Sequence, residues 1–282
     1  MLGHKLWQVL SKHFDTFATV RHQPETYARY GMFDERRLRG GIDALQFDSV
    51  TRTFADIKPD VVINSIGIIK QQADACDPVY ALEINSILPH KLKSLCRISG
   101  ARLIEISTDC VFSGKKGMYT EEDESDATDL YGRSKYLGEI SGDGCLTLRT
   151  SIIGRELNTK YGLVEWFLNN AGKKVKGYVH AIFSGFPTVV LADLIRRIIT
   201  ENPSLCGVYH VSSDSINKHD LLKLMRKVYN IKVDIDPYED FRADRSLDSS
   251  RFRRETGFIP APWPAMIEAM FTDQTPYSNW RR

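Results

Sequence analysis

Short apolar and β-branched runs alternate with longer amphipathic stretches along the first half of the chain. The runs predict strands at 17–20, 41–45, 60–65, 102–107 and 146–150. Between them, apolar residues at helical spacing predict helices at 2–13, around 50–58 and over 80–99. Strands that alternate with helices in this way form a parallel sheet with helices on both faces. The pattern therefore predicts an α/β fold built on a doubly wound parallel sheet.

After Ser151 the alternation becomes less regular. A strand-like stretch is expected at 181–186, and Pro187 stands where the first turn of a clear helix begins. At 282 residues the chain is long enough for one large core or for two fused lobes. Because no repeat or linker-like tract separates the halves, two lobes would share chain crossings.

The charge balance and the spacing of cysteine and histidine exclude several classes of protein. Lys and Arg number 38 and Asp and Glu number 36, and they are interspersed, so no basic stripe predicts a nucleic-acid partner. The cysteines form no C-x-x-C pair and the histidines no H-x-x-H pair, so we expect neither a disulfide framework nor a metal site. The chain shows no signal-peptide core, and its most apolar stretch, 61–69, is too short to span a bilayer. We expect a protein of the reducing cytoplasm without a membrane partner.

Tyr131 and Lys135 place a phenol and an ammonium four residues apart, in a helix that Thr128 or Asp129 is expected to cap. At that spacing the two side chains lie on one helical face, one turn apart. A phenol titrates near pH ~10, and a neighbouring cation favours its anion, so the pair can hold a tyrosine ready to exchange a proton near neutrality. The spacing alone is weak evidence, because it also arises by chance.

The position of this pair strengthens the proton-transfer interpretation. The helix follows a strand that ends in Ser107 and Thr108, and ligands of open α/β sheets bind at the carboxyl ends of strands. There Thr108 can hydrogen-bond a substrate carbonyl while Tyr131 protonates it, and Lys135 can reach a cofactor ribose. The alternative is that Ser107 and Thr108 only cap a strand end and that Tyr131 packs on the sheet.

Several motifs carry a family resemblance in their order along the chain. They are Val61–Gly67, Glu83–Asn85, Ile106–Gly114, Tyr131–Glu139, Leu148–Thr150, Gly185–Thr188 and Asp244–Phe252. Together they resemble the extended short-chain dehydrogenase/reductases, most closely the dTDP-4-dehydrorhamnose reductase branch. The likeness covers nearly the whole chain, which makes it specific.

The resemblance implies two lobes. Residues 1–150, with a return segment at about 186–212, would form an NADP-binding Rossmann lobe. Residues 151–185 and 213–282 would form a smaller α/β lobe for a nucleotide-sugar substrate. The implied reaction is hydride transfer to the 4-keto group of a nucleotide-linked 6-deoxyhexulose. A homodimer is a further expectation, although the sequence does not determine the oligomeric state.

Matching positions assign roles to individual residues. The resemblance gives Thr108, Tyr131 and Lys135 the catalytic roles, and it gives Asn85 the role of the helix-borne asparagine that supports the proton relay beside the cofactor. Cys110 stands where the related 4,6-dehydratases normally have a glutamate, so elimination is disfavoured. Because no base neighbours Cys110 in sequence, we expect it to pack and not to act as a nucleophile.

The chain departs from the family at its start. The family begins with a strand and a turn of three glycines, whereas here Gly3 stands where the third glycine is expected, and the strand and the first two glycines are missing. Because that strand is central in the doubly wound order, its neighbours would lose a hydrogen-bonding partner. We expect in-frame upstream coding sequence to supply a short strand and a G-x-x-G turn.

Other positions match the family's cofactor and substrate contacts. Arg21 directly follows the second strand, where a guanidinium suits the 2′-phosphate of NADP and a carboxylate would suit NAD, so NADPH is expected in preference to NADH. The alternative is an arginine that only faces solvent. The remaining expected cofactor contacts are Asp43 near the adenine, and Ser65, Ile66 and Gly67 at the end of the fourth strand. The candidate pyrophosphate ligands, which could equally be surface residues, are Arg245 and Arg251.

Two other functions stay open. A sugar-nucleotide epimerase with the same tyrosine and lysine would give no net NADPH oxidation. The same branch also includes the regulatory subunit of methionine adenosyltransferase, so a regulatory or interaction protein is the alternative that is not an enzyme. The intact Thr108, Tyr131 and Lys135 argue against it.

Overall fold

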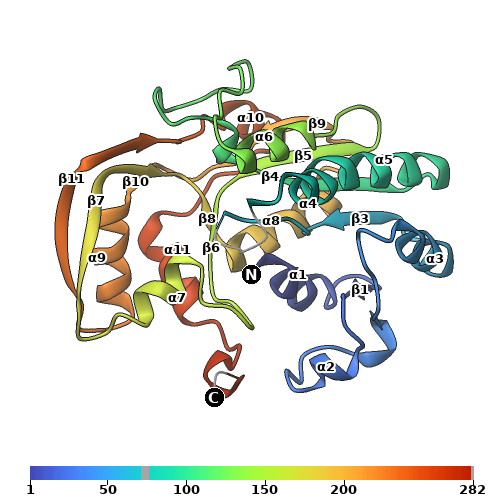
Figure 1. Cartoon of the computed structure of the whole chain (residues 1–282), viewed down its shortest axis with the longest axis horizontal. Helices are drawn as coiled ribbons and strands as arrows, with labels where there is room; N and C mark the ends of the chain where they lie inside the picture. Colours follow the sequence, from blue (N-terminus) through green and yellow to red (C-terminus); the bar gives the residue numbers. More distant parts are fainter. Residues whose placement is uncertain (71–75, 281–282) are drawn as a thin grey trace.

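A computed structural model describes residues 1–70 and 76–280. At its centre lies a parallel sheet in the strand order β3–β4–β5–β9 (Figure 1). The strands are β3 (Val61–Asn64), β4 (Arg102–Thr108), β5 (Cys145–Thr150) and β9 (Gly207–His210). The α/β fold with a parallel Rossmann-type sheet, predicted from the alternating pattern, is thereby confirmed.

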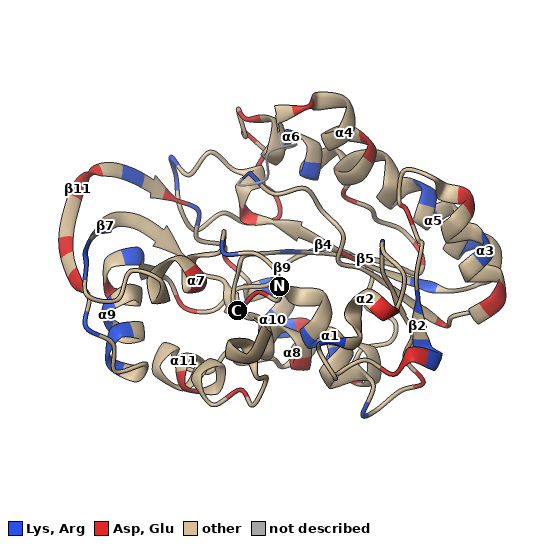
Figure 2. Ribbon diagram, turned by 60° about the horizontal axis from the view of Figure 1, so that its bottom comes forward, with Lys and Arg blue, Asp and Glu red and all other residues tan. Residues whose placement is uncertain are grey.

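Helices cover both faces of this sheet, as Figure 2 shows. The α-helices are α1 (Leu2–Leu10), α2 (Glu25–Ala28), α3 (Phe47–Ile57), α4 (Pro78–Leu82), α5 (Leu88–Ser99), α6 (Leu130–Leu137), α7 (Leu163–Leu168), α8 (Thr188–Glu201), α9 (Lys218–Val228), α10 (Ser250–Thr256) and α11 (Trp263–Phe271). Leu103 packs with α3 and α5, whereas its neighbour Ile104 packs with α1 and α8. Successive strand residues point to opposite faces, so β4 serves two cores at once.

The first two strands stand apart from the central sheet. β1 (Ala18–Thr19) and β2 (Leu38–Arg39) form a two-stranded parallel sheet. Among the described residues, β1 pairs only with β2 and β3 only with β4, so these two sheets are not joined. The strand predicted at 41–45 is wrong: β2 ends at Arg39, and Gly41 turns the chain with a φ of 69°.

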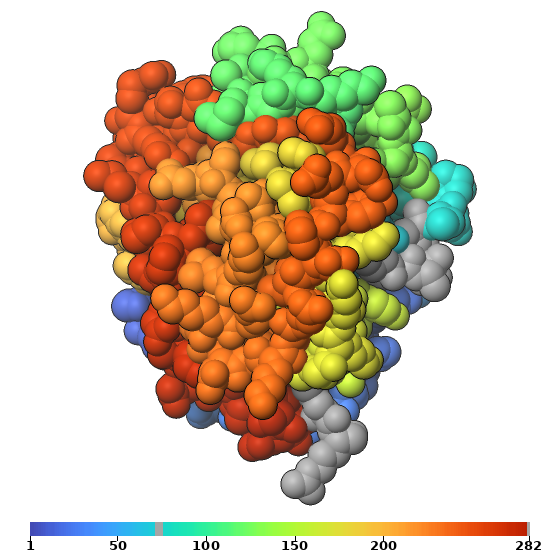
Figure 3. Space-filling model, turned by 90° about the vertical axis from the view of Figure 1, so that its left-hand side faces the viewer, coloured from blue at the N-terminus to red at the C-terminus, as the bar shows by residue number. Residues whose placement is uncertain are grey.

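A second sheet, in the order β10–β7–β11, comes from the second half of the chain. Its strands are β7 (Lys174–Phe183), β10 (Ile216–Asn217) and β11 (Asp234–Asp244). Figure 3 shows this side of the molecule, where the yellow to red segments of the second half lie together. The strand predicted at 181–186 in fact begins at Lys174, and a separate short strand, β8 (Phe186–Pro187), pairs with β6 (Ile152–Ile153).

The two sheets share one hydrophobic core. A single cluster of buried residues runs from α1 through β4 and β5 to β7, α9 and α11. All three strands of the second sheet lie in the ranges predicted for the smaller lobe. The boundaries of the two lobes stay a prediction.

The helix predicted over 80–99 is interrupted. A π-helical turn, η3 (Glu83–Ile87), lies between α4 and α5. A π turn inserts an extra residue and re-aims the side chains around it, often at functional sites. Here it carries Asn85, which is 1% exposed, into the interior.

Two further properties hold for residues 1–70 and 76–280. No helix there combines the length and the apolar character that a bilayer span requires. No group of three His, Cys, Asp or Glu side chains gathers there as a set of metal ligands.

Candidate active site

The carboxyl end of β4 and the first turn of α6 form the centre of the site. Thr108 ends β4, and its Oγ1 accepts a hydrogen bond from the Cys110 amide at 3.1 Å. α6 begins after Asp129, whose carboxylate accepts a hydrogen bond from the Gly132 amide at 3.0 Å. Gly132 allows the two elements to approach, because a Cβ at this position would lie 2.2 Å from the Cys110 carbonyl oxygen. Local bonds and one glycine therefore bring the two elements together.

Thr108 and Tyr131 meet between these elements. Thr108 is buried and Tyr131 is half-buried, and a hydrogen bond joins their side chains. Burial raises the pKa of the Tyr131 phenol, and the nearby acidic groups of Cys110, Asp109 and Asp129 raise it further, whereas the bond with Thr108 lowers it. The phenol is therefore protonated at neutral pH and can donate a proton.

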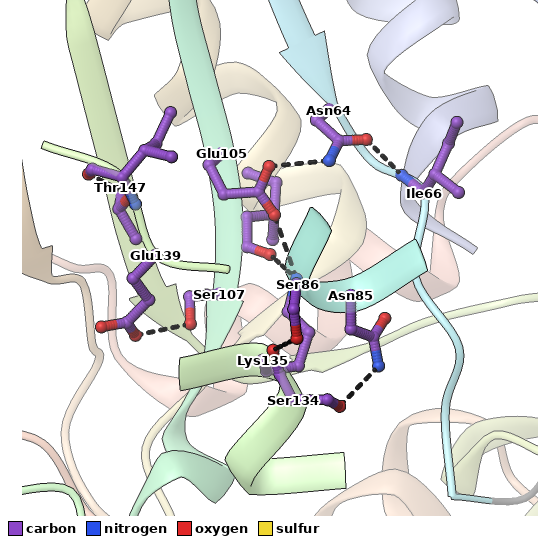
Figure 4. Close-up of polar contacts among 12 residues, drawn as sticks. Asn64, Ile66, Asn85, Ser86, Glu105, Ser107, Ser134, Lys135, Glu139 and Thr147 are labelled. Atoms are coloured by element: carbon purple, nitrogen blue, oxygen red, sulfur yellow. Dashed lines mark hydrogen bonds and ion pairs between the residues drawn. The ribbon is translucent and has the colours of Figure 1, made fainter. Parts of the chain in front are cut away.

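Lys135 directs its ammonium at Glu105 on β4. The Nζ atom donates to Glu105 Oε1 at 3.0 Å and to the Ile106 carbonyl oxygen at 2.7 Å (Figure 4). The side chains of this ion pair are 6% and 1% exposed. We expected Lys135 to bring the pKa of Tyr131 toward neutrality. Burial raises the pKa of the phenol, and the lysine charge faces a carboxylate, so the effect of Lys135 on Tyr131 stays a prediction.

Glu105 and its second partner, Asn64, were not predicted as site residues from the sequence. Glu105 Oε2 accepts a hydrogen bond from Asn64 Nδ2 at 2.7 Å, and Asn64 Oδ1 accepts one from the Ile66 amide at 3.1 Å. A signal was present in the sequence, because the charged Glu105 interrupts the apolar run of Leu103, Ile104 and Ile106. A charge at such a position has to be paired once it is buried.

Asn85 joins the loop after β3 to α6. Its Oδ1 accepts from the Ile68 amide at 2.9 Å, and its Nδ2 donates to the Ile68 carbonyl at 3.2 Å and to Ser134 Oγ at 3.1 Å. Gly138 permits this close contact, because a Cβ there would lie 1.9 Å from the Asn85 carbonyl oxygen. Asn85 thus ties α6 to the loop expected beside a cofactor, and its part in a proton relay stays a prediction.

Four of the predicted cofactor residues gather near the end of β3. A Cβ on Gly3, in the first turn of α1, would lie 3.3 Å from Ser65 Oγ, and one on Gly67 would lie 3.5 Å from Asn85 Oδ1. Ser65 and Ile66 are exposed directly after β3. The start of α1 and the end of β3 therefore lie side by side.

Arg21 and Asp43 form a second pair beyond the ends of β1 and β2. Arg21 Nη2 lies 3.9 Å from Asp43 Oδ2, and the arginine side chain is 62% exposed. Such an ion pair contributes little to stability, because both groups remain in water. The guanidinium is therefore accessible to an anionic ligand.

The residues predicted around the substrate do not all lie together in the structure. Burial raises the pKa of the Cys110 thiol to about 12, so it stays protonated, in agreement with a packing role. Arg245 Nε donates to the Phe112 carbonyl at 2.9 Å, and its charge acts on Asp109. Arg251 instead pairs with a carboxylate of its own helix, Glu255, at 3.3 Å. The structure thus brings only Arg245 of this candidate pair into contact with the turn after β4.

A second buried ion pair, also missed, lies next to the first. Glu139, just after α6, accepts from Arg149 Nε at 2.8 Å and from Arg149 Nη2 at 2.7 Å. Ser107 Oγ donates to the same carboxylate at 2.7 Å, and Arg149 Nη1 contacts His210 Nε2 at 3.1 Å. The other ring nitrogen of His210 lies 2.9 Å from the Tyr119 carbonyl, so the imidazole is neutral, with its proton on Nδ1. This network braces the end of α6 against β5 and β9.

Comparisons with known proteins agree with these features. The family described as the RmlD substrate binding domain matches residues 1–275. The spore coat polysaccharide biosynthesis protein SpsK of Bacillus subtilis strain 168 is 32% identical over 177 residues, which are 60% of this chain and 60% of that protein. The methionine adenosyltransferase 2 subunit beta of Xenopus tropicalis is 25% identical over 252 residues, 80% of this chain and 68% of that protein.

A solved structure shows the same fold. The dTDP-4-dehydrorhamnose reductase of Bacillus anthracis, in complex with NADP, superimposes with a TM-score of 0.73 at 22% identity, over 90% of this chain and 96% of that one. The family match extends over nearly the whole length of the chain and includes every motif on which the resemblance was based. The chain belongs to the RmlD substrate-binding domain family.

Proposed function

We propose that this protein reduces the 4-keto group of a nucleotide-linked deoxysugar with NADPH. The observation that carries the proposal is the contact between Thr108 and Tyr131 at the carboxyl end of a central parallel strand, with Lys135 one helical turn further along. Family membership supports a sugar-nucleotide substrate. The name of the B. subtilis relative supports a place in polysaccharide synthesis.

In this proposal Thr108 and Tyr131 act on the same carbonyl group of the substrate. The Thr108 hydroxyl would hold the carbonyl oxygen, and the Tyr131 phenol would donate its proton to that oxygen as negative charge develops there. The raised pKa of Tyr131 keeps the phenol protonated before the reaction. The phenolate left afterwards is a stronger base than usual, so it is quickly reprotonated.

The residues present fit a dinucleotide in their chemistry. Gly3 leaves the first turn of α1 without a side chain beside Ser65, and a helix N-terminus favours phosphate. Arg21 offers an exposed guanidinium that matches a 2′-phosphate. When bound, NADPH would supply the hydride for the carbonyl carbon. Ser65, Ile66, Gly67 and Asp43 would line it, and Asn85 would hold the loop in place.

The test is nicotinamide absorbance with a panel of 4-keto nucleotide sugars. We expect net NADPH oxidation by the wild type and a loss of about 100-fold to 10,000-fold for Tyr131→Phe, because a general acid contributes about that much. Tyr136→Phe, on an exposed side chain of the same helix, is the matched control and should retain the wild-type rate. Full turnover by Tyr131→Phe would contradict the proposal. An epimerised product formed without net NADPH oxidation would favour an epimerase.

The cofactor preference has its own test. Arg21→Ala should raise the KM for NADPH about tenfold and leave the KM for NADH unchanged, because only NADP carries the 2′-phosphate. Arg36→Ala removes an exposed arginine of the same region and serves as the control. An unchanged ratio of the two KM values in Arg21→Ala would refute the assignment of this residue.

A second candidate function has one observation in its favour. The methionine adenosyltransferase subunit covers 80% of this chain, a larger share than the B. subtilis relative covers. The chain could therefore act as a regulatory partner of such an enzyme. Absence of turnover over the whole sugar panel, together with complex formation with a methionine adenosyltransferase catalytic subunit in gel filtration, would favour this function.

A further inference from the structure

A groove lies where strands β7 and β11 begin, beside the last turns of α9. Figure 2 shows the blue segments of α9 close to those of the adjoining turn and strand start. Six cations and one carboxylate give the lining a formal net charge of +5, which exceeds the +2 of the whole chain. These charged lining residues are Lys173, Lys174, Lys223, Arg226, Lys227, Lys232 and Asp234. The fold therefore concentrates positive charge that is spread over separate segments of the sequence.

Most of this charge is not neutralised within the chain. Lys174 pairs with Asp236 at 3.2 Å, and Lys223 lies 3.9 Å from Asp220. The other four cations of the groove form no ion pair with any residue in the described part of the chain. Clustered charges of one sign repel each other and destabilise the compact state. An anionic partner would relieve this repulsion.

Stabilisation of the helix explains only part of the cluster. Arg226 and Lys227 lie in the last turn of α9, where a cation interacts favourably with the helix dipole. Lys173 and Lys232 lie outside any helix, in the turns that precede β7 and β11. A backbone hydrogen bond from the Gly172 amide to the Lys232 carbonyl holds these two turns together. No helix dipole accounts for the cations of the turns, and their position beside α9 points to a ligand.

The size of the groove favours a ligand larger than a metabolite. Its volume is about 1170 Å³, whereas small-molecule pockets have about 300–1,000 Å³. All six cations are exposed, so none is buried in one fixed geometry. Lysine is a compact charge on a flexible stem, which can follow a ligand without a fixed shape. The groove therefore suits a flexible, extended polyanion.

The lining also distinguishes between kinds of polyanion. None of the described lining residues is aromatic, so the bases of a single-stranded nucleic acid would find no side chain on which to stack. The exposed carboxylates of Asp220, Asp234 and Asp236 lie in or beside the groove, where they would face an anionic bilayer. Ile231, which is half-buried in the lining, offers an apolar contact. Carboxylates and an occasional apolar side chain are what an acidic peptide presents.

We propose that this groove binds an extended acidic segment, rich in Asp and Glu, of a partner protein. Its carboxylates would pair with the cations of α9 on one wall and with those of the two turns and strand starts on the other. Such complementarity of charge speeds association and selects the partner. The inference goes beyond the proposed function and does not depend on it, because no residue of the groove belongs to the candidate active site.

The test measures binding of labelled poly-L-glutamate to the full chain by fluorescence anisotropy. We expect the wild type to bind, and we expect the affinity to fall as the salt concentration rises. Lys223→Gln combined with Arg226→Gln and Lys227→Gln should weaken binding about tenfold, because three exposed cations are lost from one wall. Absence of binding by the wild type, or undiminished binding by this triple variant, would overturn the proposal.

A matched control separates the groove from the net charge of the protein. Lys91→Gln combined with Lys93→Gln and Arg97→Gln removes the same two lysines and one arginine from another helix, α5. This control should bind like the wild type, and an equal loss of affinity would overturn the proposal.

A second variant keeps the test decisive if the α9 variant does not fold. Lys173→Gln combined with Lys232→Gln changes the other wall of the groove and should also weaken binding. Undiminished binding by this double variant would overturn the proposal as well.

The other possible occupants are tested with the same variants. The probes are vesicles of phosphatidylglycerol and phosphatidylcholine, and a single-stranded DNA oligonucleotide. We expect both to bind more weakly than poly-L-glutamate, and tighter binding of either probe that depends on the groove cations would overturn the assignment to a peptide. Gel filtration tests for a second copy of this chain: self-association that the α9 variant abolishes would likewise overturn it.

Discussion

Two buried ion pairs lie side by side under α6, and they are built in opposite ways. In one, the helix supplies the cation Lys135 and strand β4 supplies Glu105. In the other, Glu139 follows the helix and strand β5 supplies Arg149. All four side chains are almost fully buried.

The difference lies in how tightly each cation is held. Arg149 donates to Glu139 through two nitrogens, Ser107 donates to the same carboxylate, and His210 contacts the guanidinium. These contacts fix the guanidinium in one orientation. Lys135 holds Glu105 through one compact ammonium on a flexible stem. The arginine pair therefore has the geometry of a rigid brace, whereas the lysine pair keeps the freedom of a flexible stem.

The largest expected effect comes from breaking the brace. Arg149→Met leaves Glu139 buried without its cation, which should cost about 3–5 kcal/mol of unfolding free energy in urea titrations. Lys135→Met should cost less, because burial raises the pKa of Glu105 and lets that carboxyl take up a proton instead of staying charged. Equal losses in the two variants would remove the distinction between the pairs.

The next effect is a pH dependence of the brace. Burial, and then the charge of Arg149, lower the pKa of His210 from 6.5 to about 4. Between these two values the unfolded chain binds a proton that the folded chain does not, so stability falls as the pH drops from about 6.5 to about 4. His210 accounts for about 3 kcal/mol of this loss of unfolding free energy. His210→Asn keeps a donor for the Tyr119 carbonyl and should lose this share of the pH dependence, measured by urea unfolding at both pH values. If the unfolding free energies of the variant and the wild type changed by the same amount between the two pH values, the prediction would be contradicted.

The smallest effect concerns the hydroxyl groups around the pairs. Ser107→Ala removes a bond to the charged Glu139 and should cost about 1.5 kcal/mol of unfolding free energy. Ser86→Ala removes a bond to the neutral Ser134 carbonyl and should cost about 1 kcal/mol or less. A greater loss for Ser86→Ala would show that Glu139 does not depend on its third donor.

Local patterns predicted much of the fold because they depend on near neighbours. The apolar runs of β3, β4 and β5 and the helical spacing of α1 and α3 were visible in the sequence, and Asp129 was one of two expected caps for α6. The strand expected at 41–45 was misplaced, because Ala44 packs against a hydrophobic cluster of helix and strand residues instead of joining a sheet. The π turn at Asn85 gave no signal, since it depends on how α6 packs against that helix.

The sequence by itself determined which chemical groups this protein has: a phenol and an ammonium at helical spacing after a strand that ends in a threonine. It also determined the family, because the motifs occur in one order over nearly the whole length. Only the tertiary structure decided where the lysine charge points. Glu105 lies 30 residues from Lys135 along the chain, and only the packing of α6 on β4 brings a buried carboxylate close enough to bind the ammonium.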